Sequence, residues 1–215
     1  MLAGWRRLTG HRGAEPGYAP QGNDLTMADE RWLILGLGNP GPQYAGNRHN
    51  VGYMCCDAIA ASVGTSLKRD RARALAGTGR LAGTPVVLAK PMTFMNLSGG
   101  PAAALRTFYK IPDERILVVH DELDLPFGTI RLKLGGGDNG HNGLRSITSA
   151  LRTRDYYRLR IGIGRPPGRM DPADYVLRDF AASERAELPE IIGRSADAVE
   201  VLLTKGLAEA QNQFH

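Results

Sequence analysis

The chain has 215 residues, of which 42% are hydrophobic and 23% are charged, and its net charge is +5. These values are typical of a globular protein with one substantial core or at most two small ones, and they exclude a disordered or fibrous chain. No run of about 18 apolar residues occurs, so we expect no membrane-spanning helix and no membrane partner.

Residues 1–26 differ from the rest of the chain. They are rich in Gly, Arg and Pro, show no hydrophobic periodicity and lack the apolar core of a secretory signal. We expect them to form a disordered N-terminal extension, and we expect residues 27–215 to form one domain.

The next hundred residues alternate between strand-like and helix-like segments. Asn47 is a plausible N-cap for the first helix, which Gly64 would end. Pro101 is tolerated in the first turn of the second helix. The predicted elements are a strand at 32–37, a turn at 38–42, a helix at about 49–63, hairpin strands at 72–80 and 85–89, and a helix at about 99–109.

The second half of the chain continues this alternation. Residues 116–119 are wholly apolar, as expected of a strand that is buried on both faces. Apolar residues from Leu188 to Leu203 repeat at three and four positions, which predicts an amphipathic helix that Gly206 ends. The other predicted elements are strands at 129–134 and 157–163 and a helix at 142–151.

Strands that alternate with helices predict an α/β fold. Two hairpin-like pairs add antiparallel strands to it. The predicted architecture is therefore a single domain with a twisted, mixed but mostly parallel sheet flanked by helices.

The only two cysteines, Cys55 and Cys56, are adjacent within the first predicted helix. Neighbouring cysteines rarely form a disulfide with each other, and no second pair exists to complete a metal site. We therefore expect a reducing, cytoplasmic location.

Basic residues concentrate in one part of the chain. From 131 to 169, nine Arg or Lys face two Asp, which gives a net charge of +7. From 170 to the end, nine acidic residues face four basic ones, which gives −5. This asymmetry predicts a face that attracts a polyanion, although a solvated surface without a partner explains the charges about equally well.

Residues 36–41 read Gly-Leu-Gly-Asn-Pro-Gly and satisfy the GxGxxG pattern of dinucleotide-binding proteins. Pro40, however, removes an amide that could face a pyrophosphate, and the helix begins well beyond the last glycine. No second strand ends in the acidic residue that such a site needs. A turn whose glycines expose Asn39 is the alternative that we favour.

His49 stands at the predicted start of a helix, where the helix dipole would keep its ring neutral and able to accept a proton. A base also needs a partner that fixes its tautomer, and Asp121, at the end of a buried strand, is the candidate. Asn39, Met95 and Asn96 follow two other strands. Sites in α/β sheets gather at the carboxyl ends of strands, so we expect these side chains to meet, although each taken singly is more often structural.

A metal site must also be weighed, because His120, Asp121, Glu122 and Asp124 lie close together in the sequence and His141 follows them. No pair of them has the spacing of a helical zinc site, and His120 and Asp121 point to opposite sides of a strand. We therefore expect no catalytic metal.

His141 and Asn142 follow the glycine-rich residues 135–140 and open a helix. Such a loop offers amides and polar side chains to an anionic or carbonyl group, although a plain glycine loop with an Asn cap explains it equally well. Composition and spacing thus lead to a His–Asp hydrolase or transferase beside a basic face, and not to a substrate.

Five blocks of the sequence resemble bacterial-type peptidyl-tRNA hydrolases. They follow the order expected of that family and span residues 32 to about 180, which is far more specific than any single motif. The blocks are GLGNPG with Tyr44 and RHNVG (36–52), KPMTFMNLSG (90–99), HDELD (120–124), GGGDNGHNGL (135–144) and RLRIGIGRP (158–166).

The resemblance implies a monomeric enzyme that hydrolyses the ester bond between a peptide and the 3′ end of a tRNA. His49 would be the general base that activates water, and Asp121 would hold its ring. The family needs no metal or cofactor, and its partner is peptidyl-tRNA rather than another protein. The residues implied in substrate binding are Asn39, Tyr44, Phe94, Met95, Asn96, His141 and Asn142, and those implied in binding a tRNA phosphate are Lys133 and Arg160.

Two departures from the family pattern are minor. Asn47 stands where the family often has Thr, and Asp138 and Asn139 occupy a variable part of the glycine loop. The extension at 1–26 has no counterpart. Rival interpretations are an RNA-binding protein without activity, a nicotinamide-dependent oxidoreductase and a metal hydrolase.

Overall fold

A seven-stranded mixed sheet forms the centre of the structure, a computed structural model that describes residues 31–215. The extension predicted at 1–26 lies outside the described residues. The strand order is β2-β3-β4-β1-β5-β7-β6. The strands are β1 (Trp32–Gly36), β2 (Lys68–Asp70), β3 (Ala74–Leu81), β4 (Thr84–Pro91), β5 (Ile116–Glu122), β6 (Ile130–Leu134) and β7 (Tyr157–Gly162).

The four central strands, β4, β1, β5 and β7, run parallel to one another. β3 pairs antiparallel with β4 across a turn at Ala82 and Gly83, which both have the positive φ that a two-residue hairpin requires. β6 pairs antiparallel with β7 at the opposite side of the sheet. The predicted fold class, one α/β domain with a mixed sheet, is confirmed.

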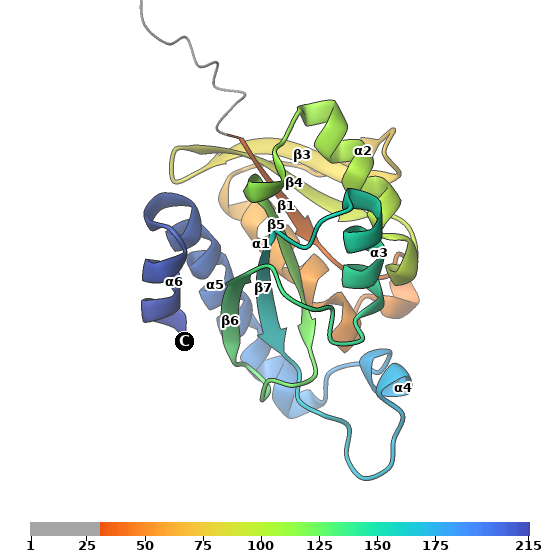
Figure 1. The fold of residues 1–215 in the computed structure, drawn as a ribbon. Coiled ribbons are helices and arrows are strands. Elements are labelled where there is room, and N and C mark those ends of the chain that lie inside the picture. The colour runs from red at the N-terminus through yellow and green to blue at the C-terminus, as the bar shows by residue number, and fades with distance from the viewer. Residues whose placement is uncertain (1–30) are drawn as a thin grey trace, which may run out of the picture.

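Helices cover both faces of the sheet: α1 and α5 lie on one face and α2 and α3 on the other (Figure 1). No helix in the described part of the chain is both long and apolar enough to cross a membrane. The helices are α1 (Val51–Ser62), α2 (Gly99–Tyr109), α3 (Asn142–Leu151), α4 (Pro172–Val176), α5 (Ala182–Lys205) and α6 (Leu207–Phe214), with 3-10 turns η1 (Pro42–Tyr44), η2 (Arg48–Asn50), η3 (Met95–Leu97) and η4 (Asp113–Arg115).

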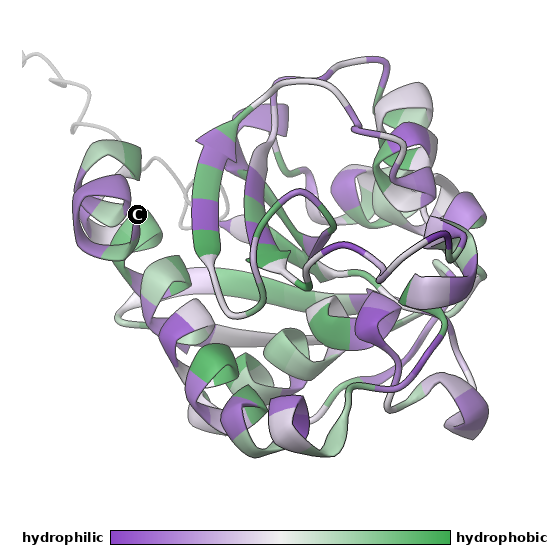
Figure 2. Ribbon diagram, turned by 90° about the horizontal axis from the view of Figure 1, so that it is seen from below, coloured by the Kyte–Doolittle hydropathy of each residue, from purple (hydrophilic) through white to green (hydrophobic). Residues whose placement is uncertain are grey.

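Alternation along each strand divides the core into two layers. In β1, Ile34 belongs to the cluster that includes α1 and α5, whereas Leu33 and Leu35 belong to the cluster that includes α2 and α3. β1 is therefore hydrophobic on both faces, whereas the strand beside the C-terminal helix is banded (Figure 2). This banding belongs to β6, where Arg131 and Lys133 alternate with buried residues.

Gly36 of the GxGxxG segment and Gly52, at the start of α1, pack against the chain itself. A Cβ at Gly36 would lie 2.3 Å from the carbonyl oxygen of Gly52, and one at Gly52 would lie 2.3 Å from that of Val119. α1 therefore begins directly against β1 and β5, which brings His49 to the ends of these strands. The prediction that the glycines expose Asn39 is wrong, because Asn39 is only 7% exposed.

Several element boundaries differ from the predicted ones. β5 continues to Glu122 rather than ending at 119, because its polar end is buried by distant parts of the chain. Asn47 does not cap the first helix with its side chain; its amide nitrogen donates instead to the carbonyl oxygen of Leu177. The short helix α4 and the terminal helix α6 were not predicted, since neither follows a clear apolar repeat.

α6 completes the edge of the sheet at β6. The side-chain amide of Gln211 donates to the carbonyl oxygen of Leu132 (3.0 Å), and the backbone N–H of Leu132 donates to Nε2 of His215 (2.7 Å). Burial, with the charge of Arg131, lowers the pKa of His215, which agrees with a neutral ring that accepts a hydrogen bond. The helix thus occupies backbone groups that an open edge would offer to another strand.

The contact of α1 with the strand ends predicts a large difference between two glycine substitutions. Gly52→Ala should lower the free energy of unfolding by about 3 kcal/mol, because the new Cβ meets backbone atoms that cannot move aside. Gly193→Ala, within α5, should raise it by about 1 kcal/mol, because outside the adjoining backbone of α5 no atom of the described residues lies within 4 Å of the position that the new Cβ would take. Urea denaturation measures both, and equal effects would contradict the packing argument.

Candidate active site

Three neighbouring parallel strands, β4, β1 and β5, end at the same edge of the sheet. Asn39 follows β1, Met95 and Asn96 lie in η3 after β4, and Asp121 is the penultimate residue of β5. η2, which carries His49, packs against this edge beside β5. The sheet thus brings together side chains that are far apart in the sequence.

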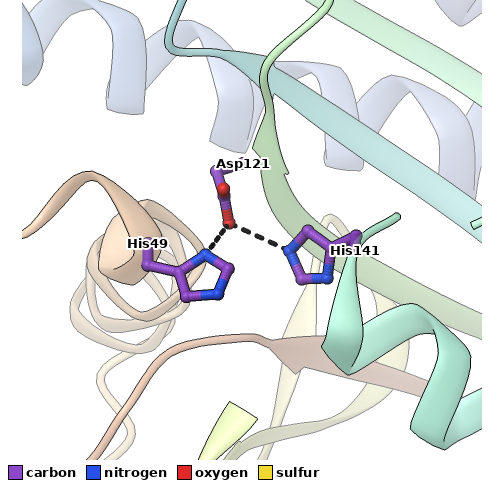
Figure 3. Close-up of side chains that lie close together, drawn as sticks. All are labelled: His49, Asp121 and His141. Carbon is purple, nitrogen blue, oxygen red and sulfur yellow. Dashed lines mark hydrogen bonds and ion pairs between the residues drawn. The ribbon is translucent and has the colours of Figure 1, made fainter. Parts of the chain in front are cut away.

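Asp121 lies between two imidazoles that approach it from different elements (Figure 3). Its Oδ1 is 2.8 Å from Nδ1 of His49 and 3.0 Å from Nε2 of His141. The centroids of the two rings are 5.1 Å apart. Asp121 is 3% exposed, so these two contacts replace the hydration that its carboxylate has lost.

Hydrogen bonds fix the tautomers of both rings. Nδ1 of His141 accepts the backbone N–H groups of Gly143 and Leu144 at the start of α3, so its Nε2 carries the proton that is donated to Asp121. An ionised Asp121 can only accept, so His49 donates to it through Nδ1. The remaining nitrogen of His49, Nε2, has no partner within the described residues and is left as the proton acceptor.

The charges of this group shift its protonation equilibria. Burial alone would raise the pKa of Asp121, but the two imidazoles hold it well below its usual range. Burial alone would lower the pKa of His49, but the charge and the hydrogen bond of Asp121 raise it above 6.5. The prediction that the helix dipole keeps His49 neutral is therefore wrong in direction, because the carboxylate in direct contact outweighs the dipole.

Asn50, which sequence reasoning did not single out as a site residue, fixes the neighbouring asparagine. The backbone N–H of Asn39 donates to its Oδ1 (2.8 Å), and its Nδ2 donates to the carbonyl oxygen of Asn39 (2.9 Å). The side-chain oxygen of Asn39 accepts the N–H of Met95 (2.8 Å). The side-chain nitrogen of Asn39 is the group that remains available as a donor.

Two cavities open on either side of His49, with volumes of about 410 and 390 Å³. His49 and Asn142 line both of them, and Ala173 and Val176 of α4 border both as well. The first cavity also contains Asp121 and His141. The other residues of the second cavity are Asn39, Tyr44, Phe94, Met95, Asn96 and Leu177.

The second cavity is mainly apolar. The rings of Tyr44 and Phe94 meet edge to face with centroids 6.4 Å apart, and Phe94 is 56% exposed. Met95 is buried beneath them. This cavity offers an apolar surface next to the amides of Asn39 and Asn96, a combination that suits a peptide.

Arg48 binds the segment that contains α4 and the start of α5 to the site. Its guanidinium donates to the carbonyl oxygen of Asp179 (2.6 Å), pairs with Glu184 (2.6 Å) and lies 4.3 Å from the ring centroid of Tyr175. Because Arg48 directly precedes His49, the same turn holds both the imidazole and the wall of the two cavities.

Lys133 and Arg160 lie outside both cavities, on β6 and β7. They face the same side of the sheet as Arg131 and Arg158, which are their direct cross-strand neighbours. Burial, together with the charges of Arg160 and Arg158, lowers the pKa of Lys133. We call these four cations the basic row (Arg131, Lys133, Arg158 and Arg160). Arg158 is buried, and a bound anion would relieve the repulsion among the other three.

His49, Asp121 and His141 are also the described residues whose ligand atoms lie near enough to hold a metal ion, within 4.8 Å of one another. Two imidazoles and a carboxylate suit zinc. However, the two ring nitrogens nearest Asp121 carry the protons that they donate to it. The closest atoms are thus not free ligands, and the fit to a metal is poor.

Comparisons with known proteins agree with this geometry. A family model described as peptidyl-tRNA hydrolase matches residues 33–215. The chain belongs to the peptidyl-tRNA hydrolase family. A peptidyl-tRNA hydrolase of Frankia alni is 66% identical over 187 residues, which cover 87% of this chain and 95% of the relative. One of Streptomyces coelicolor is 57% identical over 196 residues, or 88% and 98% of the two chains.

Solved structures show the same relationship. The peptidyl-tRNA hydrolase of Acinetobacter baumannii superposes with a TM-score of 0.81 at 40% identity, covering 86% of this chain and 95% of the other. The predicted family and the prediction of an enzyme are confirmed. The family's five sequence blocks fall at the strand ends, at the start of α3 and on β7, around the two cavities.

The raised pKa of His49 can be tested without reference to activity. NMR titration of the imidazoles should give a His49 pKa above 6.5 in the wild type. In Asp121→Asn it should fall below 6.5, because burial then acts without the opposing carboxylate. His215, at the β6 edge, serves as the internal control and should titrate alike in both proteins. A His49 pKa that does not change would contradict the assigned contact.

Proposed function

We propose that this enzyme hydrolyses the ester bond that joins a peptide to the 3′ end of a tRNA, with His49 as general base and Asp121 as its positioning partner. One observation supports this function above all others. Nε2 of His49 is held as a free acceptor between two cavities, while Nδ1 is tied to a buried carboxylate. We further propose that the catalytic domain spans residues 27–215 and acts as a monomer in the cytoplasm.

In the proposed reaction, Nε2 of His49 takes a proton from a water molecule as the water oxygen attacks the ester carbonyl carbon. The resulting imidazolium is stabilised by Asp121. The tetrahedral intermediate then collapses, and the bond from the carbonyl carbon to the ribose oxygen breaks. The proton on His49 passes to that oxygen, so the products are a peptide carboxylic acid and a tRNA with a free hydroxyl.

Asn39, Asn96 and Asn142 would supply the hydrogen bonds that bind the peptide and stabilise the oxyanion, which a general base alone does not provide. The free side-chain nitrogen of Asn39 would donate to a peptide carbonyl or to the developing oxyanion. Asn96 and Asn142, both exposed on the cavity walls, offer a donor and an acceptor each, as a peptide backbone requires. Tyr44, Phe94 and Met95 would contact the peptide side chains, and His141 would keep Asp121 in place.

The basic row would bind the tRNA backbone. Lys133 and Arg160 match the family's phosphate-binding positions, and within residues 31–215 the one carboxylate paired with either of them is Glu122, which contacts Arg160. The neutral ester would then lie in the cavities and the polyanion outside them. Contacts with phosphates provide most of the affinity of proteins for nucleic acids and depend strongly on salt.

Replacement of His49 should abolish most of the activity. His49→Ala should lower kcat for N-acetylaminoacyl-tRNA by roughly 10²–10⁴ with an unchanged fold, because it removes the ring nitrogen that is placed to take the proton from water. kcat/KM of the wild type should rise with pH through the raised pKa of His49, above 6.5. Assays contain a strong chelator, so that a metal hydrolase would be detected by its inhibition.

A His49→Ala variant with the wild-type rate would refute the base assignment. tRNA binding without any cleavage by the wild type would instead support the rival RNA-binding function. A rise in melting temperature with NAD would support the nicotinamide-dependent rival.

Lys133→Ala should weaken substrate binding and its dependence on salt. We expect a higher KM and a plot of log KM against log salt whose slope is smaller by about one phosphate contact. Lys68→Ala, which removes an equal charge from the opposite edge of the sheet, is the matched control and should leave the slope unchanged. Equal slopes for Lys133→Ala and the wild type would argue against this part of the proposal.

A further inference from the structure

Glu122 ends β5 next to Asp121, but its side chain points to the other face of the sheet. Alternation along the strand directs Asp121 to the histidines and Glu122 to the basic row. Glu122 is 5% exposed although it carries a carboxylate. A buried carboxylate needs partners that compensate for its lost hydration. Glu122 has no role in the proposed reaction, so its partners must explain its position.

The partner of Glu122 is Arg160. Nε of Arg160 donates to Oε2 of Glu122 at 2.9 Å. The two terminal nitrogens of the guanidinium have no partner within the described residues. A guanidinium held by Nε keeps its outer fork free, and that fork is the edge with which arginine binds a phosphate through two parallel hydrogen bonds.

The rest of the carboxylate is also held in place. Its Oε1 accepts the backbone N–H of Asp124 (3.2 Å), and the side-chain nitrogen of Asn139 lies 3.5 Å from Oε2. Asn139 belongs to the glycine loop at 135–140, which directly precedes His141. Glu122 is thus in contact with the strand end, the loop and the arginine at the same time.

Arg158 holds the same loop from the other side. Its guanidinium is completely buried and donates to the carbonyl oxygens of Gly137 and Gly136, the latter at 2.7 Å. Lys133 lies against Gly136, where a Cβ would come within 2.9 Å of its ammonium nitrogen. Arg158 and Lys133 thus hold the backbone of the loop beside the basic row. The direction of the Arg160 side chain is set separately, by its contact with Glu122.

We propose that Glu122 is a positioning residue that aims Arg160 at a phosphate of the substrate. It acts by geometry: the contact with Nε turns the two terminal nitrogens outwards, towards the anion. This inference rests on the proposed function, since it assigns Arg160 to tRNA binding, but it adds a residue that neither the reaction nor the phosphate contact itself includes.

The two roles that a buried carboxylate could have here, charge and geometry, predict opposite effects on KM. Glu122→Gln and Glu122→Ala remove the same negative charge. The amide oxygen of Gln can still accept the hydrogen bond from Nε of Arg160, whereas Ala removes that acceptor. We expect Glu122→Gln to have a KM for N-acetylaminoacyl-tRNA equal to or below that of the wild type, because the basic row becomes more positive.

Glu122→Ala should raise KM about tenfold, the effect of losing one well-oriented charged hydrogen bond, and leave kcat within about twofold. In an Arg160→Ala background, Glu122→Ala should have no further effect on KM, because it acts through that side chain. Glu114→Ala, an exposed carboxylate at the opposite end of β5, is the matched control. Thermal melting of every variant verifies that the fold is retained.

The inference is overturned if Glu122→Ala lowers kcat while KM is unchanged, or if Glu122→Gln raises KM as much as Glu122→Ala. Additive effects of Glu122→Ala and Arg160→Ala would also overturn it. In each of these cases the proposed hydrolysis would still stand. A wild-type chain that does not cleave the ester would overturn the proposed function as well.

Discussion

The buried carboxylate of Asp121 is the group on which the remainder of the site depends. Burying an unpaired carboxylate is unfavourable, and here two N–H donors, which both bind the same oxygen, stabilise it. The donors belong to His49, before α1, and His141, at the start of α3. One charge therefore fixes the tautomer of His49, holds the ring of His141 and joins the two segments that border the cavities.

The register of β5 determines which chemistry lies on which side of the sheet. Asp121 faces His49, whereas Glu122 faces the basic row, and His120, on the same face as Glu122, packs its ring against His141 (centroids 4.9 Å apart). A slip by one residue would exchange these roles and place Glu122 or His120 against His49. The close packing of Gly36 against Gly52 and of Gly52 against Val119 resists such a slip, because it fixes α1 against both strands. Gly36, which belongs to the GxGxxG segment, and Gly52 thus fix the geometry of the candidate site.

Local signals explain which features the sequence could predict. α2 and α3 have the predicted bounds, 99–109 and 142–151, because their ends are set by nearby residues. Features that depend on distant contacts could not be predicted in this way. Asn50 looks like an ordinary helix-start residue until it meets Asn39, and Glu122 looks solvent-exposed until Arg160, 38 positions away, covers it. The direction of the His49 pKa shift was predicted wrongly although Asp121 was named as its partner, because the strength of that contact depends on burial and distance, which the sequence does not give.

The acidic and basic parts of the sequence lie on opposite faces of the sheet. The acidic C-terminal part forms α5 and α6, which pack with α1, whereas the basic row points to the opposite face. The first cavity carries carboxylates of its own, among them Asp171 and an Asp124 that is paired with Arg165, so its lining holds more acidic than basic groups near His49. On the proposed function, a tRNA backbone is attracted to one face and repelled from the cavity, and the uncharged ester is the part of the substrate that can approach the base without electrostatic penalty.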